Sequence, residues 1–249
     1  MTDLEFLWPS SPTDWSLETG QVHVWAVNLQ LPESRISAFA MTLSHDEAAR
    51  AARFHSDRDR NRFIVGRGVL RAILACYVGW VPEKLRFVYG PKGKPALDSV
   101  PDGKNLFFNL AHAGDLLLLA VSRVCAVGVD VEYIRPCEEA ENIAANHFSA
   151  HEASGLQNLP AAQRMEAFYR LWTRKEAWLK ATGDGISESL SQVEVSFLAE
   201  EPARLVRLFG SSEAVKEWTL RELLPASGFL GALAAPAKGI LLKCWHWSE

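Results

Sequence analysis

The sequence has few cysteines, and they do not form a metal-binding or disulfide pattern. Cys76, Cys125, Cys137 and Cys244 are far apart and include no C-x-x-C pair, which argues against a zinc site and against a disulfide framework. Long hydrophobic runs are also missing, since the longest strongly apolar segment is the short LLLLAV at 116–121. The first fifteen residues lack a basic segment followed by an apolar stretch. We therefore expect a cytoplasmic protein with reduced thiols that does not act at a membrane.

The chain has no excess of positive charge. Its formal net charge of −4 offers no general attraction to nucleic acid, so any anion must be bound by a local cluster. Such a cluster exists, because seven arginines crowd the stretch 50–71: Arg50, Arg53, Arg58, Arg60, Arg62, Arg67 and Arg71. A solvated helix face would explain them equally well, although the planar guanidinium fork suits phosphate groups.

An internal repeat is present at an offset of 105 residues. The strand-like VHVWAVNL at 22–29 aligns without a gap with VGVDVEYI at 127–134. SHDEA at 44–48 aligns with SAHEA at 149–153, and both have the Ser-x-x-Glu spacing of a helix capping box. FIVGRGVLRAIL at 63–74 then aligns with FYRLWTRKEAWL, and both have apolar residues at helical spacing.

The repeat predicts an α+β fold made of two similar halves, 1–125 and 126–249, related by pseudo-twofold symmetry and derived from an internal duplication. Each half should end in a hairpin, at 106–122 and at 218–235. The halves differ at one place, because Asp130 and Glu132 of the second half align with Trp25 and Val27 of the first. Acids in only one copy favour a single site in the cleft between the halves.

The segment GVDVE at 128–132 combines a valine face with an acidic face. Side chains alternate along a strand, so Asp130 and Glu132 lie on one face, about 7 Å apart, and repel each other unless water or a cation separates them. A solvated edge strand is one explanation. A metal site is the other.

A second acidic motif, WTRKEAWLK at 172–180, lies on a predicted helix. Glu176 and Lys180 are one turn apart there, and an ordinary surface ion pair worth about 0.2–0.5 kcal/mol would explain them. Together with GVDVE, however, this motif brings the number of carboxylates to three, which are hard oxygen ligands of the kind Mg²⁺ takes. Lys175 and Lys180 would add cations for a phosphate. The combination suits a magnesium–polyphosphate complex.

These two motifs, at this spacing, resemble the signature of the 4′-phosphopantetheinyl transferases, in particular the large two-half type that activates surfactin synthetase and similar enzymes. Three other segments also resemble the family: RFHSDRDRNRFIVGRGVLR at 53–71, GPKGKPAL at 90–97 and FNLAHAGD at 108–115. The last departs from the family pattern, because Ala111 and Ala113 stand where serines are usual. This departure puts in doubt any hydrogen bond from those two positions to a diphosphate.

The resemblance implies a reaction and a set of site residues. The reaction is Mg²⁺-dependent transfer of 4′-phosphopantetheine from coenzyme A to a serine of an acyl or peptidyl carrier protein, with release of 3′,5′-ADP. Glu176 or Glu152 would take the serine proton, and Glu152 has a purely helix-capping explanation as well. Glu132 would bind the metal directly or through water. The implied residues are Asp130, Glu132 and Glu176 for the metal, Lys180 for the leaving oxygen, Arg50, Arg53 and Arg62 for the nucleotide phosphate, and Lys94 and His112 for the rest of the cofactor.

Two other functions remain open from the residues alone. A metal-dependent nuclease would also use clustered acids with a lysine, although the acidic net charge argues against a nucleic-acid groove. A coenzyme A-binding or carrier-docking module without turnover would be the non-enzymatic alternative. We also expect a monomer that does not bind nucleic acid.

Overall fold

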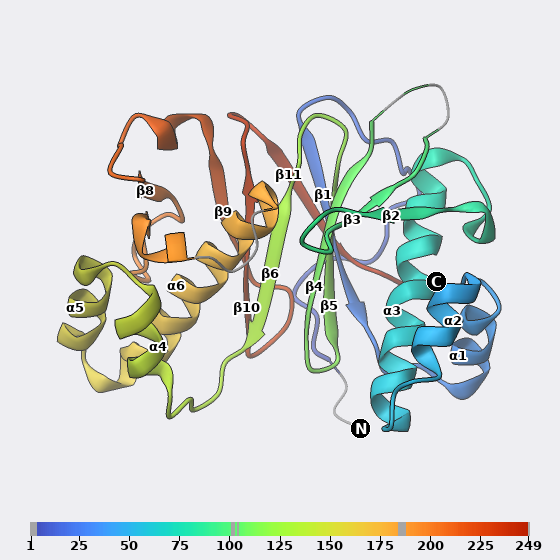
Figure 1. Ribbon diagram of the computed structural model, residues 1–249, viewed down its shortest axis with the longest axis horizontal. Coiled ribbons are helices and arrows are strands. Elements are labelled where there is room, and N and C mark those ends of the chain that lie inside the picture. The colour runs from blue at the N-terminus through green and yellow to red at the C-terminus, as the bar shows by residue number, and fades with distance from the viewer. Residues whose placement is uncertain (1–3, 101–102, 104, 184–187, 249) are drawn as a thin grey trace.

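The computed structural model describes residues 4–100, 103, 105–183 and 188–248 (Figure 1). Helices and strands follow one another in an order that repeats once along the chain. The elements of the first half are β1 (Gln21–Asn28), α1 (Glu33–Ala40), α2 (His45–Ala51), α3 (Asp57–Val78), η1 (Pro82–Lys84), β2 (Phe87–Tyr89), β3 (Pro95–Leu97), β4 (Phe107–Ala113) and β5 (Leu116–Ser122). The elements of the second half are β6 (Gly128–Tyr133), α4 (Ala140–His147), α5 (Ala150–Asn158), α6 (Ala161–Thr182), η3 (Glu188–Gln192), β7 (Val193–Val195), β8 (Leu205–Leu208), η4 (Ala214–Glu217), β9 (Thr219–Leu223), β10 (Phe229–Ala235) and β11 (Leu241–His246).

The predicted α+β duplication is confirmed by this order. Strand β1 corresponds to β6, the three helices α1–α3 to α4–α6, and the hairpin β4–β5 to β9–β10. The long helices α3 and α6 both have 22 residues. The two halves therefore repeat one scaffold.

Local sequence signals set the ends of the helices. Helices α2 and α5 both begin with a capping box. In α2, Glu47 accepts a hydrogen bond from the backbone amide of Ser44 at 3.0 Å, and in α5, Glu152 accepts one from the backbone amide of Ser149 at 2.9 Å. Helices α3 and α6 both end at a left-handed glycine, with φ of 69° and 82° respectively. Equivalent signals thus produce equivalent helices in the two halves.

The two larger sheets lie face to face, and the helices cover their outer sides (Figure 1). One sheet has the order β11-β1-β5-β4 and the other the order β6-β10-β9. Between the sheets lies a core of small and branched side chains such as Val24, Leu118, Val129 and Leu233. Helix α3 packs on the outer face of the first sheet and α6 on that of the second. The result is a four-layer α-β-β-α arrangement with the junction of the halves at its centre.

Strand β11 departs from the division at residues 125 and 126 that the repeat predicts. It lies after β10 in the sequence, yet it pairs in parallel with β1, with Gln21 opposite Leu241 and Ala26 opposite His246. The first sheet therefore includes a strand from the end of the second half. This strand has no counterpart in the repeat.

Among the described helices, none combines the length and the apolar composition that crossing a bilayer requires. The cytoplasmic location stays a prediction from the sequence.

A buried polar network occupies the first half beneath β1. His23 is 1% exposed, and its Nδ1 lies 2.7 Å from the hydroxyl of Tyr77, which also accepts a hydrogen bond from Trp25 Nε1 at 2.9 Å. The His23 Nε2 atom lies 3.1 Å from Gln21 Oε1. Burial, together with the charge of Lys243, lowers the pKa of His23 to about 4. The imidazole is therefore neutral at physiological pH.

This histidine should make the protein sensitive to acid. The unfolded chain takes up a proton at His23 near pH 6.5, whereas the folded protein does so only near pH 4, so stability is lost as the pH falls through this window. We expect His23→Gln to remove roughly 2 kcal/mol of the acid dependence of unfolding between pH 7 and pH 4. Urea unfolding of both proteins across this range measures the difference, and parallel pH profiles would contradict it.

Candidate active site

Strand β6 presents two different faces, as the alternation of GVDVE predicts. Val127, Val129 and Val131 are buried in the core between the sheets, and Asp130 faces α6, where its Oδ1 lies 2.6 Å from the ammonium of Lys180. Gly128 shares this face and allows the helix to approach, because a Cβ added there would lie 2.0 Å from the Ala177 carbonyl oxygen. The glycine thus brings the acidic strand directly against α6.

The pKa of three carboxylates is raised at this contact, in each case first by burial. Burial raises the pKa of Glu176, and the negative charge of Asp130 raises it further. Burial also raises the pKa of Asp130, against the effect of Lys180. The pKa of Glu132 rises to about 7, because of burial and then of the charge on Asp130. Negative charge is therefore concentrated in a partly dehydrated place, and a cation would stabilise it.

Two oxygens of this acid cluster, which comprises Asp130, Glu132 and Glu176, lack a hydrogen-bond partner among the described residues. They are Asp130 Oδ2 and Glu176 Oε1, and both are buried. Buried carboxylate oxygens without a partner are costly and suit a bound cation. Asp130 Oδ1 is occupied by Lys180, and across the described part of the chain no three His, Cys, Asp or Glu side chains already stand in a metal-holding arrangement. The donor set thus fits Mg²⁺ in chemistry, and the lysine must release Asp130 for it to bind fully.

Positive charge from both halves of the molecule acts at His112, on β4. Burial of its ring, and then the charges of Lys180 and Arg62, lowers the pKa of His112. Arg62 belongs to α3 and binds Asp115, in the turn after β4, at 2.6 Å. Lys180 of the second half and Arg62 of the first therefore act on one point at the junction. An anion could be held there beside the acid cluster.

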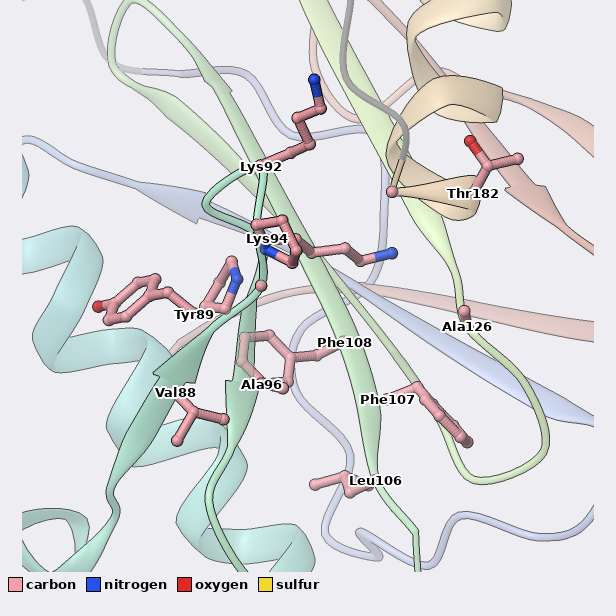
Figure 2. Close-up of a pocket in the computed structure, with 14 residues that line it drawn as sticks. Val88, Tyr89, Lys92, Lys94, Ala96, Leu106, Phe107, Phe108, Ala126 and Thr182 are labelled. Atoms are coloured by element: carbon pink, nitrogen blue, oxygen red, sulfur yellow. The ribbon is translucent and has the colours of Figure 1, made fainter.

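Two adjoining pockets open at the same junction. The smaller, of about 260 Å³, is lined by Glu176, Lys180 and Asn109 among others. The larger, of about 450 Å³, is lined mainly by apolar side chains of β2, β3 and β4, including Tyr89 and Phe108 (Figure 2). Both pockets include Lys94 and Gly183 in their walls. They form one groove, which we call the junction groove, with a charged end and an apolar end.

Lys94, which the resemblance assigns to the cofactor, does not present a free ammonium in the described structure. Its Nζ donates hydrogen bonds to the carbonyl oxygens of Val127 at 3.1 Å, of Ala181 at 3.2 Å and of Lys180. Burial lowers its pKa. Three acceptors surround the ammonium, so it links the β2–β3 loop to the second half.

Glu152 and Lys175 also have structural partners, which does not fit the catalytic alternative for Glu152 or a phosphate-binding role for Lys175. Both side chains are 1% exposed, and they form an ion pair at 2.7 Å. Glu152 also accepts hydrogen bonds from the backbone amides of Ser149 and Val195. Lys175 also donates hydrogen bonds to the backbone carbonyl oxygens of Leu190 and Val193. Neither charge is free to meet a substrate.

Lys175→Met should therefore destabilise the protein without slowing its reaction. The substitution leaves the carboxylate of Glu152 buried without its counter-ion, which typically costs about 3–5 kcal/mol. We expect urea unfolding to show this loss, and turnover per folded molecule to stay within about twofold of the wild-type value. Lys216→Met is the control, because the pair of Lys216 with Glu213 is exposed and should contribute about 0–1 kcal/mol. A large loss of turnover with unchanged stability would instead indicate that Lys175 takes part in the reaction.

The first half contains the equivalent of this buried pair, and it uses two members of the arginine cluster. Glu47 accepts hydrogen bonds from Arg67 Nε at 2.6 Å and from Arg71 Nε at 2.7 Å. Arg67 and Arg71 are buried, so they serve the fold. Arg50 and Arg53 are exposed, and the guanidinium of Arg50 lies 5.3 Å from the ring centre of Phe63.

The two alanines that replace the usual serines are buried. Ala111 and Ala113 lie in the apolar core between the sheets, at 7% and 8% exposure. Asn109 shares their strand face and was not singled out from the sequence. A lone polar residue on the strand face that it shares with Phe107, Ala111 and Ala113 was the signal that could have found it.

Comparisons with known proteins agree with the motifs. Residues 31–124 match a family model described as 4′-phosphopantetheinyl transferase, N-terminal, and residues 126–234 match one described as 4′-phosphopantetheinyl transferase superfamily. The chain is 39% identical to the 4′-phosphopantetheinyl transferase HetI of Nostoc sp. over 244 residues, which cover 98% of this chain and 100% of the relative. It is 35% identical to the 4′-phosphopantetheinyl transferase psf-1 of Bacillus pumilus over 166 residues, which cover 67% and 68% of the two chains.

Proposed function

The chain belongs to the 4′-phosphopantetheinyl transferase superfamily and is an enzyme of that class, and from this we propose a specific reaction. It is the Mg²⁺-dependent transfer of 4′-phosphopantetheine from coenzyme A to a serine of an apo-acyl or peptidyl carrier protein, with release of 3′,5′-ADP. Membership of this superfamily favours a transferase over the nuclease and over the module without turnover.

One observation carries this proposal. The acid cluster, with two carboxylate oxygens that have no partner among the described residues, contacts Lys180, and Lys180 and Arg62 of the first half both act on His112. A diphosphate with a divalent cation has charges complementary to this arrangement. Phosphoryl transfer depends mainly on positioning and on electrostatic stabilisation, both of which such a site supplies.

Asp130, Glu132 and Glu176 would hold the magnesium ion. When bound, it supplies positive charge that offsets the charge of the diphosphate and polarises the phosphorus that is attacked. The mutual repulsion of the acids is relieved at the same time. Whether Glu132 acts directly or through a water molecule depends on how far its side chain moves from the position described.

Glu176 is the group we assign to take the serine proton, directly or through water, because it lines the charged end of the junction groove beside Lys180. The serine oxygen then bonds to the phosphorus that carries pantetheine, and the bond from this phosphorus to the oxygen of 3′,5′-ADP breaks. Lys180, released from Asp130, would donate a hydrogen bond to that leaving oxygen and stabilise its charge.

The junction groove would receive coenzyme A. Its charged end adjoins Glu176 and Lys180, and its apolar end suits an uncharged part of the cofactor. His112 would contact the diphosphate, and Arg62, already oriented by Asp115, would face the nucleotide end together with Arg50 and Arg53. The cofactor would then span both halves of one chain, which supports action as a monomer.

Mass spectrometry of a carrier protein tests the proposal. An apo-carrier protein incubated with coenzyme A, Mg²⁺ and the enzyme should gain the mass of one phosphopantetheinyl group on its serine, because that serine is the acceptor of the transferred phosphorus. Carriers of fatty-acid, polyketide and peptide synthases should be tested in parallel, since the surfactin-activating type predicts activity on peptidyl carriers.

Two controls accompany this assay. Omission of Mg²⁺, with EDTA present, should remove the mass gain, and so should a carrier in which the acceptor serine is alanine. If no carrier of any class is modified although coenzyme A binds, the proposed reaction is wrong. If the mass gain persists without any divalent cation, the reaction is right and the role of the acid cluster is wrong.

A further inference from the structure

Strands β4 and β6 are neighbours where the two halves meet, but they belong to different sheets. In the part of the chain that the structure describes, β4 pairs with β5 and β6 pairs with β10. The two strands are nevertheless linked, by a hydrogen bond that the Val129 amide of β6 donates to the side-chain oxygen of Asn109 in β4. Side chains therefore contribute to holding the second half at its position relative to the first.

Lys94 of the first half is one such side chain. Figure 2 shows it extending from the β2–β3 loop toward the end of α6 and the start of β6, near Thr182 and Ala126. Its ammonium donates to the carbonyls of Lys180 and Ala181, which are among the last carbonyls of α6. Such carbonyls lack partners within their own helix, so the lysine completes the end of α6 from the opposite half.

The same ammonium also binds the acidic strand. It donates to the Val127 carbonyl at 3.1 Å, and two residues further the Val129 amide donates to Asn109 Oδ1 at 2.9 Å. Asn109 is 5% exposed. These two contacts lie on either side of Gly128, the residue at which α6 touches the strand. The backbone just before Asp130 is thus fixed by two side chains of the first half.

We infer that Lys94 and Asn109 are positioning residues for the transfer reaction. They hold β6 and the end of α6 in place. Because Asp130 lies on β6 and Lys180 lies near the end of α6, this also sets the distance of these two residues from Arg62 and His112, the side chains of the first half that would bind the anion. The diphosphate must reach both groups at once, so this distance determines whether the reacting atoms align. A lysine in this loop would otherwise be expected to bind a phosphate of coenzyme A. The ammonium of Lys94 instead binds three backbone carbonyl oxygens, so we assign it to positioning.

Lys94→Met and Asn109→Ala test this inference. We expect each to lower kcat about tenfold or more, because displacements near 1 Å at a reacting centre have effects of this size or larger. The KM for coenzyme A and the Kd of 3′,5′-ADP should change much less than kcat, because the Lys94 ammonium and the Asn109 oxygen are already bonded to the backbone of the second half. Amide hydrogen exchange should become faster at residues 127–131 and 179–183 and stay unchanged in α3. The double variant should be less than additive, because both side chains hold one segment.

Lys84→Met is the matched control. It removes one positive charge from an exposed position of the same half and should leave kcat and exchange unchanged. Lys94→Gln, which keeps a donor, should recover part of the lost kcat, and it serves as the second variant if Lys94→Met does not fold.

The inference is overturned if Lys94→Met raises the KM for coenzyme A and weakens 3′,5′-ADP binding with kcat unchanged, because the lysine would then be a phosphate ligand. It is also overturned if exchange at 127–131 is the same in all variants. The kinetic part of the test rests on the proposed reaction, but hydrogen exchange needs no turnover. A failure of the reaction itself can therefore be distinguished from a failure of the inference.

Discussion

Replacing Glu176 by glutamine is expected to slow transfer to the carrier protein by about 10³-fold, while making the metal-free protein more stable. The loss of activity follows because the variant lacks both a metal-binding carboxylate and the assigned base, groups whose removal has effects of this order or larger. The gain in stability follows because the carboxylate of Glu176 is buried, has an unpartnered oxygen within the described structure, and is repelled by Asp130. Activity and thermal unfolding without metal measure the two effects.

The gain in stability should depend on pH in a defined direction. The pKa of Glu176 is raised in the folded protein, so its charge costs stability above its ordinary pKa of 4.5, and the cost disappears when it is protonated. The advantage of the glutamine variant should therefore be present at pH 7 and shrink on acidification. Glu166→Gln, at an exposed position of the same helix, should change neither property greatly. A variant that loses activity and stability together would indicate a structural role for Glu176.

Gly128→Ala is expected to disrupt the site by forcing two elements apart. The added methyl carbon would lie 2.0 Å from the Ala177 carbonyl oxygen and 2.3 Å from the Ala181 nitrogen, and both are backbone atoms that cannot turn aside. We expect a loss of about 3 kcal/mol or more in the free energy of unfolding. The protein that remains folded should lose most of its activity, because α6 carries Glu176 and Lys180 away from Asp130.

Gly66→Ala provides a comparison for this variant. Gly66 lies within α3, where a Cβ would lie 3.4 Å from a side-chain atom of Leu117, an ordinary contact. Alanine there should be neutral or stabilise the helix by about 0.5–1 kcal/mol. Denaturant unfolding should show a loss of stability only for Gly128→Ala, and the carrier-modification assay should show a loss of activity only for the same variant. Equal behaviour of the two variants would mean that the close approach at Gly128 can relax at little cost.

Periodicity and self-comparison were enough to predict most of the scaffold. Ser44 and Ser149 mark equivalent helix starts, and the alternating valines of 127–131 mark a strand with one buried face, because both signals depend only on neighbouring residues. The offset between the halves then linked elements that are distant in the sequence. The duplicated α+β fold followed from these local rules.

The environment of individual charges could not be predicted in the same way. Lys175 and Lys180 are both lysines on α6, yet one is buried against Glu152 and the other faces Asp130 at the groove. The sequence around Lys94 predicts an exposed loop, but the ammonium of Lys94 donates hydrogen bonds to backbone carbonyl oxygens of the second half. The partners of these groups come from segments about 20 to 90 residues away, so only the packing of whole elements determines them.

Strand β11 has a consequence for the order in which the protein forms during synthesis. The backbone groups of β1 that bind β11 have no partner in the sheet until residues 241–246 have been made, after nearly all of the second half. While the ribosome is still translating the second half, the nascent first half therefore presents an open strand edge, which other chains could join. The two halves descend from one repeated unit, but the earlier one can complete its sheet only after the later one has been translated.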